Sequence, residues 1–155
     1  MTRARHVTLA ATLVVAGLGL AACEKPAPSV SVFSGTTTQH REALCWSFDS
    51  DSLAPGSCAQ DLVTKALEGD GVATIPVVPG ETIGISVDTV VAEAGWTPVI
   101  GGQKLVQTPL EGTYYRFVYP DLQEVPADGL SLQVVAGRDT KTRGVWVFRL
   151  APANA

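Results

Sequence analysis

Short stretches in which apolar and polar residues alternate constrain the fold of this 155-residue chain more than any other feature. In E-T-I-G-I-S-V-D, over residues 81–88, Ile83, Ile85 and Val87 fall on one side, with small or polar residues on the other. This period of two is that of a strand that buries one face and exposes the other. The stretch therefore predicts a half-buried β-strand.

Similar patterns predict strands along most of the chain. Gly101-Gly102 separates two of them, and a glycine pair supplies the positive φ angles that a tight hairpin turn needs. Seven to nine short strands with turns between them predict a mainly β fold, an immunoglobulin-like β-sandwich with one short helical insertion. The expected strands cover residues 29–33, 44–48, 72–78, 81–88, 96–100, 103–107, 115–119, 130–134 and 146–150.

The helical insertion is predicted over residues 58–68. Ser57 and Gln60 have the spacing of a capping box, and Gly69 follows as a stop signal. Residues 89–94 predict one further helical turn. The expected buried stripe of the longer helix consists of Leu62, Val63, Ala66 and Leu67.

The N-terminus has the layout of an export signal. Arg3 and Arg5 precede residues 7–22, which carry no charge and are fewer than the roughly 20 apolar residues that span a bilayer. Leu20-Ala21-Ala22-Cys23 matches the bacterial lipobox, which implies cleavage before Cys23 and lipid attachment to its thiol. The alternatives are a secretory signal in which Cys23 is incidental, or a buried apolar helix.

This interpretation divides the chain into three parts. Residues 1–22 form the lipoprotein signal peptide, residues 23–29 a lipidated tether stiffened by Pro26 and Pro28, and residues 30–155 a single β-sandwich domain. Two or three acyl chains, palmitate among them, would hold the protein on the bilayer durably. We therefore expect an extracytoplasmic protein, attached to the cell membrane by lipid.

Charge excludes one large class of partners. Removing Arg3 and Arg5 with the signal leaves nine basic residues against 15 acidic ones, a side-chain charge of −6. Phosphate neutralisation by Lys and Arg carries most nucleic-acid affinity, so no nucleic acid is expected as a partner. The sequence also has no basic cluster for anionic lipid, which leaves anchoring to the lipid on Cys23.

The two remaining cysteines, Cys45 and Cys58, predict one disulfide in an oxidising compartment. The competing interpretation, a redox pair, normally requires C-x-x-C spacing. Between them, Asp49 and Asp51 suggest a calcium loop, but Leu53 breaks the acidic pattern, so a solvated turn is the better prediction.

Catalytic and cofactor motifs are absent from the sequence. The mature chain has one histidine, His40, in a polar stretch predicted as loop, and it contains neither G-x-S-x-G nor S-x-x-K. Blue-copper and zinc sites need more histidine or free cysteine than this chain has. We predict no catalytic residue, metal or cofactor; the remaining enzymatic alternative is a paired-carboxylate site drawn from Glu111, Asp121 and Glu124.

Aromatic residues offer one candidate surface. Most occupy alternate positions that a sandwich core requires, but Tyr114 and Arg116 share the opposite face of their strand. They form the predicted surface patch.

Several segments resemble a known family. The lipobox, the segment from Cys45 to Cys58, G-E-T-I-G-I-S-V, G-W-T-P-V-I-G-G-Q and R-G-V-W-V-F-R-L are together similar to actinobacterial lipoproteins grouped as domain of unknown function 2771. The resemblance implies an envelope location and brings no catalytic residues.

Two hypotheses follow. The first is a non-catalytic envelope module that binds a protein, glycan or small ligand. The second is a small envelope hydrolase that uses paired carboxylates.

Overall fold

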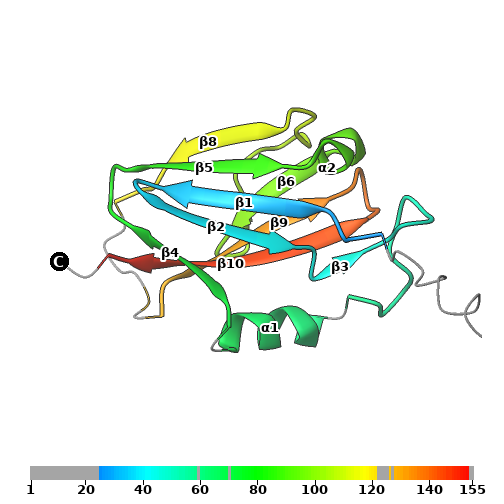
Figure 1. The fold of residues 1–155 in the computed structure, drawn as a ribbon, viewed down its shortest axis with the longest axis horizontal. Coiled ribbons are helices and arrows are strands. Elements are labelled where there is room, and N and C mark those ends of the chain that lie inside the picture. Colours follow the sequence, from blue (N-terminus) through cyan, green and yellow to red (C-terminus); the bar gives the residue numbers. More distant parts are fainter. Residues whose placement is uncertain (1–24, 59, 70, 122–125, 127, 154–155) are drawn as a thin grey trace, which may run out of the picture.

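A computed structural model describes residues 25–58, 60–69, 71–121, 126 and 128–153 and confirms the mainly β sandwich. Ten strands form two sheets that lie face to face (Figure 1). The four-stranded sheet has the order β2-β1-β5-β8, with β1 (Ser29–Ser34), β2 (Thr37–Glu42), β5 (Thr82–Val87) and β8 (Tyr114–Val118). No helix among the described residues is long and apolar enough to cross a membrane.

The six-stranded sheet has the order β3-β10-β9-β6-β7, and β4 pairs in parallel with the C-terminal half of β10. All other strand pairs are antiparallel. This sheet contains β3 (Cys45–Trp46), β4 (Ala73–Val77), β6 (Trp96–Ile100), β7 (Gln103–Lys104), β9 (Leu130–Ala136) and β10 (Gly144–Pro152). The helices are α1 (Gln60–Glu68) and α2 (Thr89–Ala94).

The strand order follows the immunoglobulin pattern. Strands β1-β5-β8 take the places of A-B-E, and β6-β9-β10 take those of C-F-G. Three features depart from it. Strand β2 is added beyond β1, and β3 and β4 both pair with β10. Residues 105–113, all described, lead from β7 to β8 without the D strand that would lie beside β8. Strand β8 therefore forms one edge of its sheet.

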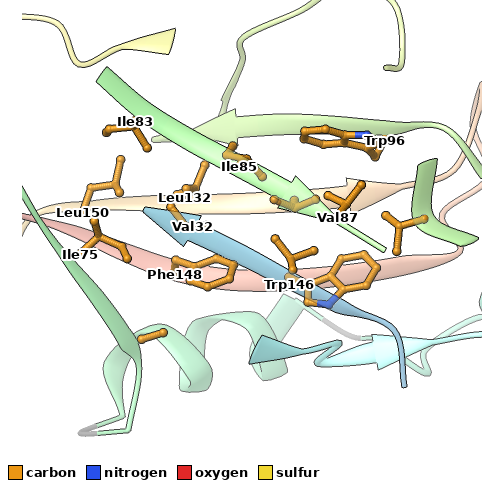
Figure 2. Packing of buried hydrophobic residues seen from close by; sticks show 14 of the residues in the cluster. Val32, Ile75, Ile83, Ile85, Val87, Trp96, Leu132, Trp146, Phe148 and Leu150 are labelled. Carbon is orange, nitrogen blue, oxygen red and sulfur yellow. The ribbon is translucent and has the colours of Figure 1, made fainter. Parts of the chain in front are cut away.

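The core lies between the sheets (Figure 2). Ile83, Ile85 and Val87 point inward from β5 as predicted, toward side chains of β9 and β10. The two buried indoles also satisfy their N–H groups: Trp96 Nε1 donates to Gly112 O at 2.8 Å, and Trp146 Nε1 donates to Pro28 O at 3.0 Å. The second bond fixes the start of the folded chain, because Pro28 is buried just before β1.

Tyr119 is a buried tyrosine at the end of β8. Its hydroxyl has no hydrogen-bond partner among the described residues, and burial raises its pKa. The phenol is therefore neutral at physiological pH and offers no phenolate for chemistry.

The prediction that His40 lies in a loop is wrong. Residues 37–42 form β2, which pairs along its length with β1 and brings the strand count to ten. T-T-Q-H-R-E lacks apolar alternation because β2 is an edge strand over which little is buried. Backbone hydrogen bonds to β1 stabilise the strand, although its polar sequence predicts a loop.

The strand predicted over 44–48 is much shorter, because only Cys45 and Trp46 pair with β10. Leu44 and Phe48 are exposed, against the prediction of a shared apolar face. The chain turns away at residue 47, where the Ser47 hydroxyl is hydrogen-bonded to that of Ser50 at 2.7 Å. The second hairpin strand is also shorter than predicted and ends at Lys104.

Helix α1 begins at Gln60, later than predicted, and the capping box is not formed. The Ser57 hydroxyl donates to Ala54 O at 2.7 Å within a turn instead of capping the helix. Leu62 is exposed, so the predicted buried stripe is too wide. Val63 alone is buried, against Val145 and Val147 of β10. Helix α2 confirms the predicted turn over 89–94.

Candidate functional site

The disulfide between Cys45 and Cys58 is confirmed, with an S–S distance of 2.08 Å. It joins β3 to the turn before α1, so neither thiol is available as a nucleophile or a metal ligand. Cys23 lies outside the described residues, and lipid attachment there stays a prediction.

Tyr114 and Arg116 lie on the outer face of β8, the face that points away from the core. The alternate residues Tyr115 and Phe117 point inward, and the Tyr115 ring meets Trp96 edge-on at 6.3 Å between centroids. Tyr114 keeps 52% of its surface exposed. The structure therefore places both residues of the predicted patch on one solvent-facing surface.

Sequence reasoning missed the second aromatic residue of this surface, Phe33 of β1. Its ring is nearly parallel to that of Tyr114, at 10°, with 6.0 Å between centroids. The two rings come from strands on either side of β5. An aromatic pair thus lies on the water side of the sheet, where the core does not require it.

Gly84 of β5 makes this arrangement possible. It is paired with Phe33 on one side and with Arg116 on the other, so it lies at the centre of the outer face. A Cβ atom at this position would overlap Cε2 and Cζ of the Phe33 ring. A glycine inside a strand often marks such a close approach, and this signal could have been read from G-E-T-I-G-I-S-V.

Three further side chains lie on the same outer face as the aromatic pair, by strand register. Arg116 supplies a positive charge, Val118 is 60% exposed, and His40 shares a 3.0 Å hydrogen bond between its Nδ1 and the Ser31 hydroxyl. This surface is called the outer patch and consists of Phe33, His40, Tyr114, Arg116 and Val118. Its rings offer apolar area and its rim offers hydrogen-bond donors, the combination that suits a binding surface.

A charged cavity of about 310 Å³ lies at the other candidate location, the end of the sandwich where β9 joins β10. Arg138 on its wall has structural partners: Glu111 at 2.7 Å and the carbonyls of Glu93 and Ala94 at the end of α2. A cation at a helix C-terminus stabilises the helix dipole. This arginine is thus engaged in holding α2 and the loop before β8.

Among the described residues, no ion pair or hydrogen bond brings Glu111 and Asp121, two of the carboxylates proposed for a hydrolase, together. Glu111 pairs with Arg138, Asp121 is exposed, and Glu124 lies outside the described residues. Asp49 and Asp51 are exposed in the turn after β3, as predicted. Within the described ranges, no three His, Cys, Asp or Glu side chains are grouped as a metal site would require.

Comparisons with protein-family models, with curated proteins and with solved structures find no match to this chain.

Proposed function

We propose that this protein is a lipid-anchored extracytoplasmic binding module, without catalytic activity, that engages an envelope protein or glycan through the outer patch. The observation that carries the proposal is the Phe33–Tyr114 pair on the outer face, in which Tyr114 is exposed and Phe33 half-buried, and for which Gly84 leaves room. Aromatic rings contribute large contact area at low entropic cost and are enriched where proteins bind partners. The export-signal layout that precedes Cys23 supports an extracytoplasmic location.

The tether gives the module an orientation. Between Cys23 and Pro28 the chain can extend at most about 18 Å, and Pro28 is fixed against Trp146. The loops over 47–57 and 137–143 lie at this end of the sandwich, opposite the C-terminus (Figure 1). Under the proposal these loops face the bilayer, while the outer patch faces sideways and is open to neighbours in the envelope.

The anchor predicts a change of location or of N-terminal processing when Cys23 is replaced. Cys23→Ala removes the thiol that would be acylated, so the protein should no longer sediment with membranes, or should keep its uncleaved signal. Fractionation with intact-mass analysis of the N-terminus measures both. Cys58→Ser is the matched control, since it removes a cysteine that does not carry lipid. Full membrane retention with a processed N-terminus in Cys23→Ala would refute the anchor.

The outer patch can be tested by photo-crosslinking in intact cells. A benzoylphenylalanine at position 114 should give discrete adducts with an envelope component. The same group at position 78 should give none, because Val78 is equally accessible, 50% exposed against 52%, but lies outside the patch. Immunoblotting for the shifted species measures the yield.

Loss of the adducts in a Phe33→Ala background, at unchanged protein level, would tie them to the aromatic pair. Equal adducts from positions 114 and 78 would mean that the outer patch is not the binding surface. Hydrolysis of envelope material by the purified lipoprotein, abolished by Glu111→Gln, would favour the enzyme instead.

A further inference from the structure

Within the part of the chain that the structure describes, the edge of β8 that faces away from β5 is unpaired. Thr113 O accepts from Val87 N, and Tyr119 N donates to Glu81 O, so the odd-numbered residues direct their backbone groups toward β5. By alternation, the N–H and C=O groups of Tyr114, Arg116 and Val118 point the other way. They have no backbone partner among the described residues, and β8 lies at the margin of its sheet (Figure 1).

The core beneath this edge is incompletely covered. Tyr115 and Phe117 point inward and stack at 6.4 Å between centroids, yet both are only partly buried. An immunoglobulin sheet would place strand D here, and this chain has none between β7 and β8. A strand added beside β8 would cover both rings and satisfy the free backbone groups.

Arg116 determines which strand fits. It lies at the middle of β8, and in antiparallel pairing of two β8 strands about their centre it would face the same arginine of the second copy. Like charges directly opposite each other are destabilising, whereas an opposite charge stabilises the pair. The charge of Arg116 therefore disfavours the pairing of two β8 strands and favours an added strand with an acidic residue opposite Arg116.

We propose that β8 binds an extended segment of an envelope protein, which adds as an antiparallel strand and places an acidic residue opposite Arg116. The inference rests on the proposed function and names its partner as a peptide strand with outward aromatic or apolar residues. Main-chain hydrogen bonds would supply affinity and alternate side chains would supply selectivity, as in other cases of β-strand addition.

The test uses the full lipoprotein in lipid nanodiscs and fluorescent peptides as probes. Acetyl-T-Y-V-E-V-Y-T-amide carries outward tyrosines and a glutamate, and its counterpart has lysine for glutamate. The glutamate peptide should bind about fivefold more tightly by fluorescence anisotropy, and Arg116→Glu should reverse the preference. Methylation of the glutamate nitrogen should weaken binding at least about tenfold, because that N–H faces β8. Methylation of a neighbouring valine nitrogen, which faces away, should have little effect.

Val118→Pro supplies a matched change in the protein. It removes one N–H from the free edge without removing a bond to β5, and proline is tolerated on edge strands. Weaker peptide binding in this variant, with an unchanged circular dichroism spectrum, supports strand addition. Equal binding of the glutamate peptide, the lysine peptide and the two N-methylated peptides to the wild-type protein would overturn strand addition, and this result needs no protein variant.

The two proposals fail in different ways. One outcome would keep the outer patch as the binding surface and exclude the edge of β8. In that outcome the crosslinks at position 114 require Phe33 but do not change in Val118→Pro, and N-methylation of the peptide does not alter its binding. The acidic-strand proposal would also be overturned if β8 pairs with a second copy of the chain. Analytical ultracentrifugation would then show a dimer, and Arg116→Glu would not alter it.

Discussion

Replacing Trp146 with alanine should lower the free energy of unfolding by about 4 kcal/mol, within the usual range for a large aromatic removed from a core. The ring is fully buried, lies 5.8 Å from the Trp46 ring, and its Nε1 holds Pro28 at 3.0 Å. Truncation would leave a cavity and remove one of the two donors to the Pro28 carbonyl, which would keep only its bond from Ala43 N at 3.0 Å. Urea unfolding of the lipoprotein, followed by near-ultraviolet circular dichroism, measures the loss.

Tyr114→Ala is the control, since it removes an aromatic ring from the solvent-exposed surface instead of from the core. We expect a loss below about 1.5 kcal/mol, because the exposed ring contributes little beyond its stacking on Phe33. The comparison also establishes whether Tyr114 variants remain folded in binding experiments. Equal losses in the two variants would contradict the assignment of Trp146 to the core and of Tyr114 to the surface.

The strands that could be predicted are those that bury one face. Ile83, Ile85 and Val87 alternate because one side of β5 forms the core, and the pattern is visible without the fold. Strand β2 was missed because an exposed edge strand is held by backbone bonds to β1 and leaves no apolar period. The reverse error occurred at residues 44–48, where alternation is present but the chain turns off β10 after Trp46.

Two of the five residues of the outer patch were predicted from the sequence. Alternation along a single strand is enough to place Tyr114 and Arg116 together on the face opposite Tyr115. Phe33 could not be joined to them, because its proximity depends on the order β1-β5-β8, which no local pattern specifies. The free edge of β8 likewise follows from a strand that the sandwich lacks, and only the topology reveals it.

Removing the disulfide should cost about 3 kcal/mol of unfolding free energy, and the loss should fall unevenly on the fold. The bridge ties the turn before α1 to β3, and beyond it the helix is held mainly by Val63 against Val145 and Val147 and by the bond from Arg149 to Leu67 O. This contact stabilises α1 against local unfolding less than the backbone ladder between β9 and β10 stabilises those two strands. The double variant Cys45→Ser with Cys58→Ser should therefore open locally first.

Hydrogen exchange with mass spectrometry separates the local effect from the global one. Amides over 60–68 should lose most of their protection in the double variant. Amides over 132–136, which are paired on both sides by β10 and β6, should lose no more than the global destabilisation allows. Reductant added to the wild-type protein should reproduce the pattern, which controls for the serine substitutions. Uniform loss across both segments would mean that α1 unfolds only with the sandwich, and that the bridge stabilises the domain as a whole.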